Sequence, residues 1–366
     1  MNSKERVLEA LGRTGVPDRV PLQFDLCRSL LERFREVYKI PVRYTTSYYE
    51  DVTYRISGNA LRTAMGSDCV VVGGSLPEGY THPTTDEGYI VNEFGMVMRQ
   101  GPLYMEVFEA PLADVTSVAE VAAFDFPNPH AQGRFADAEA LIAEYRDDFF
   151  VIGDLELTMF EMAWHMVGLE KFMVDLAMGE AYVTALLDRV KAFTIGVGEA
   201  LAALGVDAIW MGDDFGTQTG MMISPRMWRD VFKPRYREII EALQAVNPEV
   251  MIAFHSDGAV SPILGDLIEI GVDVFNPVQP NVPGHEPDAL KQEFGADLSF
   301  WGAIDQQHLL PNGTPKEIAA GVAEKIRILG ADGGYMCAPA HIIQADTSMA
   351  HVNAFIAAAK EHGVYG

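Results

Sequence analysis

The sequence predicts a closed (β/α)8 barrel, or TIM barrel, that forms a single domain over residues 1–366. Eight short apolar runs recur along the chain, and within each run apolar and polar residues do not alternate. Such runs are typical of parallel strands buried on both faces. "LGVDAIWM" (204–211) and "IGVDVFNP" (270–277) also repeat a glycine after a helix and an aspartate before a strand. A doubly wound open sheet stays an alternative, because periodicity does not show closure.

The predicted strands are separated by segments with helical signals. In chain order the strands are VPLQF (20–24), CVVVGG (69–74), FFVIGD (149–154), AIWMGD (208–213), VMIAFH (250–255), VDVFNP (272–277), LSFWGA (298–303) and GYMCAP (334–339). The clearest helix start is Ser224-Pro225, which opens a run to about Ala245. Serine can cap a helix at this position, and proline suits its first turn. The order of elements therefore matches eight βα units.

One segment, residues 75–130, is too long for a simple connection between the second and third strands. Within it, "GYIVNEFGMVMRQ" (88–100) alternates like a β-hairpin. We expect this insertion to cover one end of the barrel. It would serve there either as a lid or as a purely structural element.

The composition favours a globular enzyme and excludes several other classes. Of 366 residues, 49% are hydrophobic and 22% are charged, and no apolar run approaches the roughly 18 residues that a membrane span needs. The net charge of -25 argues against nucleic acid or an anionic membrane as a partner. The first residues, MNSKERVLEALGR, resemble an amphipathic helix more than a secretory signal, so we expect a cytoplasmic protein. Three widely spaced cysteines form no CxxC pair and predict neither a disulfide framework nor a thiolate metal cluster.

Polar residues follow almost every predicted strand, at the end of the barrel where TIM-barrel enzymes carry their chemistry. In strand order they are Asp25 and Arg28, Asp154 and Glu156, Asp213 and Asp214, His255 and Asp257, Asn276 and Gln279, Asp305 and Gln306, and His341 and Gln344. Surface loops selected for solubility alone would carry more lysine and glutamate. Asp213 and Asp214 have two interpretations, because "GDDFGTQTG" is rich in turn residues: they contact a substrate, or they cap a helix and order the loop.

The spacing His255-x-Asp257 suggests a metal site. Side chains two residues apart on a strand point to the same side, and closure of the barrel would bring His341 near them. Two imidazoles and one carboxylate leave a fourth coordination position open, which is the pattern of catalytic zinc. The alternative is that each histidine is a hydrogen-bonded structural residue at a strand end.

Several segments resemble the uroporphyrinogen decarboxylase superfamily. They are "GDDFGTQTGMMISPRMWRDVFKPRYREII", "HSDG", "GVDVFNPVQP", "FWGAIDQQHLLPNGTPKEI" and "GGYMCAPAHIIQADTSMAHVNAFIAAA". The resemblance runs from about residue 18 to the carboxyl end and implies a (β/α)8 barrel. The superfamily includes the haem-pathway decarboxylase and zinc-dependent methyltransferases that work with corrinoid proteins. In the decarboxylase an RQAGR motif follows the first strand, whereas "FDLCRSLLERF" here keeps only Arg28 roughly in place, so the chain is more similar to the methyltransferase branch.

The resemblance also implies the roles of individual residues. In the methyltransferases a His-x-Cys pair and a later cysteine hold zinc, and His255, Asp257 and His341 stand at those positions here. Nitrogen and oxygen ligands leave a metal a stronger Lewis acid than thiolates do. The implied reaction moves a methyl group between a small O-, N- or S-methylated compound and a corrinoid, with cobalamin carried by a separate protein. Arg28, Glu156, Asp213, Asp214, Gln279 and Gln344 would contact the substrate, and Asp154 or Asp305 would act as a proton donor.

Two other functions are compatible with the same sequence. The chain could decarboxylate a porphyrinogen or a smaller aromatic acid without a cofactor, as the haem-pathway relatives do. It could also be a non-catalytic barrel that binds a small molecule. Metal content separates the first alternative from methyl transfer, because the decarboxylase needs no metal.

Overall fold

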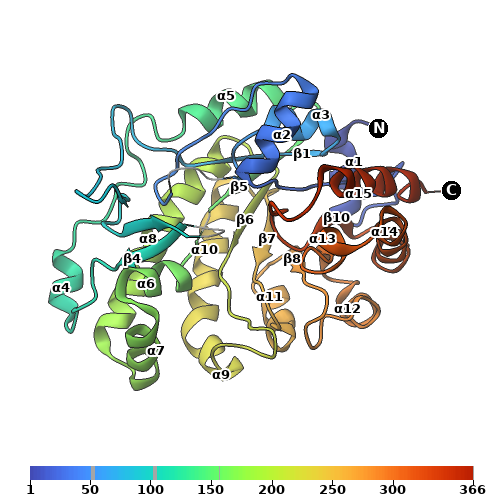
Figure 1. The fold of residues 1–366 in the computed structure, drawn as a ribbon. Helices are drawn as coiled ribbons and strands as arrows, with labels where there is room; N and C mark the ends of the chain where they lie inside the picture. The colour runs from blue at the N-terminus through green and yellow to red at the C-terminus, as the bar shows by residue number, and fades with distance from the viewer. Residues whose placement is uncertain (51–53, 102–104, 156, 366) are drawn as a thin grey trace.

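The computed structural model describes residues 1–50, 54–101, 105–155 and 157–365, and its centre is a curled sheet of seven parallel strands surrounded by helices (Figure 1). The strands are β1 (Cys69–Gly73), β5 (Phe150–Asp154), β6 (Ala208–Gly212), β7 (Met251–His255), β8 (Val274–Val278), β9 (Ser299–Ile304) and β10 (Tyr335–Pro339). Each pairs in parallel with the next one along the chain. Apart from the partly exposed Met251, every strand residue is buried, which confirms the prediction from the uninterrupted apolar runs.

The first predicted strand closes the barrel between β10 and β1, although it forms isolated bridges instead of a regular strand. Leu22 bridges in parallel to Cys337, whose backbone N–H donates to the Pro21 carbonyl over 2.9 Å. On the other side, the Asp68 N–H donates to the Leu22 carbonyl over 2.7 Å. Pro21 has no N–H to give, and the Leu22 N–H donates to the Asp68 carboxylate. The TIM-barrel prediction is confirmed, and the doubly wound alternative is excluded.

Helices cover the outside of the barrel. They are α1 (Ser3–Leu11), α2 (Arg28–Tyr38), α3 (Asn59–Met65), α4 (Val118–Ala123), α5 (Ala136–Tyr145), α6 (Phe160–Val167), α7 (Leu169–Met178), α8 (Ala181–Ala203), α9 (Pro225–Met227), α10 (Lys233–Val246), α11 (Leu264–Glu269), α12 (Pro287–Phe294), α13 (Leu309–Asn312), α14 (Pro315–Leu329) and α15 (Met349–His362). Ser224 caps the start of α9, as predicted, and a π-helical turn at Trp228–Phe232 continues into α10. Within the described residues, no helix combines the length and hydrophobicity that crossing a bilayer requires.

The insertion between β1 and β5 contains a small antiparallel sheet of β2 (Ile90–Val91), β3 (Val97–Gln100) and β4 (Met105–Glu109). The predicted hairpin is therefore present, and a third strand extends it. The Asn92 side chain orders the turn by accepting hydrogen bonds from the backbone N–H groups of Phe94 and Met96. That the insertion covers the barrel end as a lid stays a prediction.

The inside of the barrel is a packed core. Small residues such as Ala208, Ala253 and Ala338 leave room for two indoles, Trp210 and Trp301. The two rings lie 4.4 Å apart, centroid to centroid. Because the barrel is filled at this level, any site for a small molecule must lie above it, where the strands end.

Candidate active site

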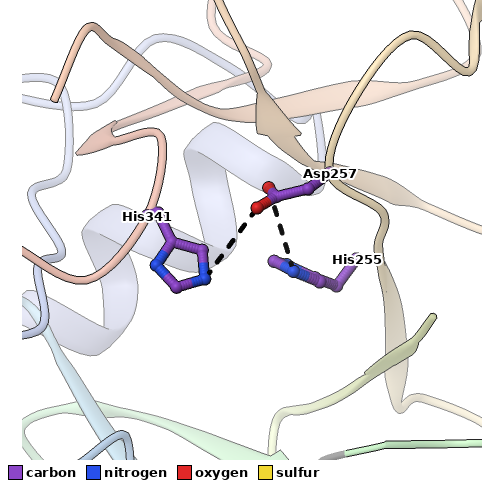
Figure 2. Close-up of side chains that lie close together, drawn as sticks. All are labelled: His255, Asp257 and His341. Carbon is purple, nitrogen blue, oxygen red and sulfur yellow. Dashed lines mark ion pairs between the residues drawn. The ribbon is translucent and has the colours of Figure 1, made fainter. Parts of the chain in front are cut away.

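Three potential metal ligands meet at the carboxyl ends of β7 and β10. His255 ends β7, Asp257 follows two residues later, and His341 lies two residues beyond β10. One ligand atom from each residue lies within 4.8 Å of the other two. Figure 2 shows the Asp257 carboxylate paired with both imidazoles. Its Oδ1 lies 4.0 Å from His255 Nε2, and its Oδ2 lies 3.9 Å from His341 Nε2. The structure therefore brings together the three residues that the sequence predicted as a metal set.

Two glycines allow the loops after β6 and β7 to approach this closely. Gly212 has a φ of +138°, and a Cβ there would lie 2.0 Å from the His255 carbonyl oxygen. Gly258 has a φ of +79°, and its Cβ would lie 2.3 Å from the Gly216 backbone. L-residues rarely adopt these φ values and would also collide with backbone. The close packing places the Asp257 N–H 2.8 Å from Asp214 Oδ1, to which it donates.

Hydrogen bonds on the Nδ1 side of the ring fix the orientation of His255. Its Nδ1 lies 2.7 Å from Asn276 Oδ1, and Trp210 Nε1 donates to the same oxygen over 3.0 Å. Because an indole N–H can only donate, it requires the oxygen of the Asn276 amide at that position. The same oxygen can only accept, so His255 Nδ1 carries the proton and Nε2 presents its lone pair to the site. This is how proteins prepare a histidine to bind a metal.

Burial controls the protonation of the three residues. It lowers the pKa of both His255 and His341 to about 3, so both rings are neutral at pH 7. Burial, together with the nearby Asp214 carboxylate, raises the pKa of Asp257 well above its usual range. Asp257 Oδ1 is buried and accepts no hydrogen bond from the described residues. A buried carboxylate oxygen without a partner is unfavourable, and a bound cation would relieve that cost.

Asp257 and His341 lie in the wall between two pockets. The larger has a volume of about 430 Å³, and its polar lining residues include Glu50, Arg55, Asp154, Glu161, His165 and Asp214. The smaller has a volume of about 110 Å³, and Gln218, Gln279 and Asp305 contribute to its lining. Gln306 and Gln307 also border both. The possible metal ligands can therefore be reached from two sides.

Asp213 and Asp214, for which the sequence allowed either helix capping or substrate contact, have different surroundings. The fully buried Asp213 accepts hydrogen bonds from the backbone N–H groups of Met159 and Glu161, at the start of α6, and from the Tyr236 hydroxyl. Burial raises the pKa of Asp213 to about 6. Asp213 thus orders the start of a helix, whereas Asp214 lines the larger pocket.

The remaining predicted residues occupy different surroundings. Asp154 lines the larger pocket, 3.4 Å from Arg55 Nη1. Gln279 and Asp305 line the smaller pocket; Gln279 Oε1 accepts from the Gly258 N–H, and Asp305 accepts from the backbone N–H groups that follow it. Arg28 is exposed and stacks over the Tyr44 ring, and neither it nor Gln344 borders either pocket. Glu156 lies outside the described residues. The proposed contacts of all these residues with a substrate stay predictions.

The sequence analysis did not assign several residues that line the larger pocket to the site. Arg55 lies over the face of Trp210, 4.0 Å from the ring centroid, and is the only arginine or lysine among the described residues that line the larger pocket. The Tyr49 hydroxyl lies 2.7 Å from His165 Nδ1, and both side chains line the same pocket. Glu161 and His165 are four residues apart on α6. That spacing puts two side chains on one helix face and was the one available signal.

Comparisons with known proteins support both the fold and the family. Residues 90–362 match the family "Uroporphyrinogen decarboxylase (URO-D)". A curated relative, methylated-thiol--coenzyme M methyltransferase of Methanosarcina mazei, is 25% identical over 203 residues, which are 55% of this chain and 51% of that protein. The aligned part thus spans about half the length of that relative.

A solved structure has the same fold over its whole length. The "methyltransferase from Methanosarcina mazei" superposes with a TM-score of 0.72 and 20% identity, and the match covers 99% of each chain. At this level of identity the superposition supports the fold alone. The resemblance to the family inferred from the sequence motifs is confirmed, and both relatives carry methyltransferase names.

Proposed function

The chain belongs to the uroporphyrinogen decarboxylase (URO-D) family, and we propose that it is a zinc-dependent methyltransferase. It would move a methyl group between a small O-, N- or S-methylated compound and a corrinoid carried by a separate protein. The main support is the convergence of His255, Asp257 and His341 in the wall of the larger pocket. The methyltransferase name of the curated relative supports this reaction class over decarboxylation.

The three residues fit a zinc ion. Two ligands at the usual 2.0 to 2.1 Å from a tetrahedral zinc lie about 3.3 Å apart. The distances of 3.9 and 4.0 Å from the Asp257 carboxylate to the two imidazoles are less than about 1 Å longer than that value, and ligand atoms of all three residues lie within 4.8 Å of one another. His255 Nε2 already presents a lone pair, and Asp257 Oδ1 lacks a hydrogen-bond partner among the described residues.

When bound, zinc would act as a Lewis acid on the heteroatom that leaves the methyl group. The ligand set suits that role, because two imidazoles and a carboxylate donate less electron density than thiolates. We therefore favour an oxygen or nitrogen leaving group over a thiol that must be made more nucleophilic.

The larger pocket would hold the body of the methyl donor. Its volume of about 430 Å³ falls within the range of small-molecule sites, and Tyr49, Leu157 and Ile342 supply apolar and aromatic wall. In the proposed reaction the carbon–heteroatom bond would break, and its electron pair would stay on the heteroatom, which would take up a proton. A reduced corrinoid would supply the electron pair that accepts the methyl group. Asp154 borders this pocket and is better placed than Asp305 to supply the proton.

Decarboxylation of a porphyrinogen is less well supported. Its many carboxylates would need several cationic partners. Among the described residues that line the larger pocket, Arg55 is the single arginine or lysine, and it already contacts Asp154. Arg28, the remnant of the arginine motif, is exposed and stacks on Tyr44.

The test begins with the metal content of the purified protein and of a variant with both His255→Ala and His341→Ala. We expect about one zinc per chain in the wild type and none in the variant. The metal-loaded protein is then mixed with reduced free cobalamin and a panel of O-, N- and S-methyl compounds, and methylcobalamin formation is followed by absorbance. The double variant should form none.

A matched control replaces two exposed histidines, His130 and His362, with alanine and should keep both metal and activity. A wild-type protein that binds no metal after gentle purification contradicts the proposal and points to cofactor-free decarboxylation or to a non-catalytic barrel. If the protein binds metal but transfers no methyl group to cobalamin, the proposed metal site stands and the proposed reaction is rejected.

A further inference from the structure

We propose that Asp214 is the fourth protein ligand of this metal site and occupies the position that the substrate heteroatom takes during reaction. The inference rests on the proposed zinc site and extends it. The set of His255, Asp257 and His341 leaves one position of a tetrahedral ion open. Asp214 is the further carboxylate that the structure places beside the triad.

The distances favour Asp214 as a ligand. Its Oδ1 lies 3.5 Å from His255 Nε2, closer than either imidazole approaches the Asp257 carboxylate. Two ligands of one tetrahedral zinc lie about 3.3 Å apart. The pair of Asp214 and His255 is therefore closer to this spacing than either pair of Asp257 with an imidazole.

The chain holds Asp214 in this position from two directions. The Asp257 N–H donates to Asp214 Oδ1 over 2.8 Å, and the Asp214 N–H donates to Glu161 Oε2 over 2.9 Å. Asp214 Oδ2 accepts no hydrogen bond from the described residues, and the side chain is 36% exposed where it lines the larger pocket. One oxygen thus anchors the loop, while the carboxylate stays accessible to an ion in the pocket wall.

The ligand types also suit a divalent cation. His255 Nε2 presents a lone pair because Asn276 accepts from Nδ1, and the carboxylates of Asp214 and Asp257 line the same pocket. Two deprotonated carboxylates together with two neutral imidazoles would neutralise one zinc ion. Asp214 faces the larger pocket, where the methyl donor would bind, so the arriving heteroatom would displace this carboxylate or join it as a fifth ligand.

The test compares Asp214→Asn with Asp214→Ala. An asparagine oxygen still accepts the hydrogen bond from Asp257 N–H but is a poor zinc ligand, so the two variants separate coordination from loop anchoring. We expect D214N to weaken zinc affinity by at least ~10-fold, measured by competition with a chromophoric chelator. In the cobalt(II)-substituted protein, we expect the intense visible absorption of a four-coordinate site to weaken in D214N.

The matched control is Asp305→Asn, a carboxylate of the smaller pocket that should keep both zinc affinity and cobalt spectrum. Thermal melts of the metal-free proteins check that each variant folds. Wild-type affinity and spectrum in D214N, with a loss only in D214A, would overturn the inference and reduce Asp214 to a loop anchor. A wild type that binds neither zinc nor cobalt removes the proposed function itself along with this inference.

Discussion

The two sides of the candidate site are built differently. On the side of β6 and β7, backbone meets backbone at Gly212 and Gly258, and side chains lock His255 and Asp257 in place. On the side of β9 and β10, Asp305 mainly orders its own loop, and His341 pairs with the Asp257 carboxylate and lies beside the His255 ring of the first side. One side holds two ligands on closely packed backbone, and the other supplies the third, while Asp257 and His341 both border the two pockets.

This difference teaches how a barrel can be both preorganised and accessible. Placing the ligands requires rigid backbone, which the β6 and β7 side provides through contacts that leave no space for a side chain. Access requires polar side chains that border the pockets, which the β9 and β10 side provides through the half-buried Gln306 and the exposed Gln307. Substitutions on the two sides should therefore have unequal effects.

The largest effect is expected for Gly258→Ala on the rigid side. A Cβ there would lie 2.3 Å from the Gly216 backbone in a chain with a φ of +79°, so both sterics and backbone strain oppose the substitution. We expect a loss of about 3 kcal/mol in the free energy of unfolding, measured with urea, and no retained metal. Gly220→Ala is the control, since no atom lies within 4 Å of a Cβ there. Equal stability of the two variants would mean that the close packing is dispensable.

An intermediate effect is expected for Asn276→Ala, which removes the acceptor that holds His255 Nδ1. The ring could then rotate or change tautomer, so zinc affinity should fall about 10- to 100-fold while the fold is kept. Chelator competition gives the affinity. Trp210→Phe keeps the amide but removes the indole N–H that orients it, and a smaller loss should result. Unchanged zinc affinity in both variants would show that His255 does not depend on the hydrogen bonds from Asn276 and Trp210.

The smallest effect is a pH dependence that reports on His255. Its pKa is about 3 in the folded protein and about 6.5 in the unfolded chain, so the unfolded state binds more protons between these values. Stability from this group is therefore complete above pH 6.5 and is lost as the pH falls toward 3. In metal-free protein, the stability difference between wild type and His255→Gln should shrink by about 1 kcal/mol from pH 7 to pH 5.5, measured by urea unfolding. A difference that stays constant would mean that the folded-state pKa is not lowered.

The sequence was sufficient to predict seven strands and the convergence of His255, Asp257 and His341, because the strands and the His255-x-Asp257 pair depend on regular spacing. Apolar runs without alternation identify buried parallel strands, and the spacing His255-x-Asp257 follows directly from strand geometry. The prediction of the first strand was only partly confirmed. Pro21 has no N–H, and the Leu22 N–H donates to the Asp68 side chain and not to a neighbouring strand. Periodicity does not report such a partner.

Other parts of the site depend on details that spacing does not contain. Asp213 and Asp214 are neighbours in a turn, and only the backbone conformation decides which one turns inward to α6 and which one faces the pocket. Arg55 lies in a stretch without helical or strand periodicity, so nothing in the sequence connects it to Trp210. Arg55 and Trp210, like Asp213 and Met159, are far apart in the sequence and come into contact only in the folded chain.

The position of Asp257 and His341 between two pockets has a kinetic consequence. A reaction with two reactants is simplest to arrange when each has its own route to the place where they meet. Reactants that approach one centre from opposite sides can bind in either order, and one product can depart while the other is still held. For the proposed methyl transfer, the architecture of this wall would therefore suit a random-order mechanism through a ternary complex, with intersecting lines in double-reciprocal plots, and not a ping-pong cycle in which both reactants use a single entrance in turn.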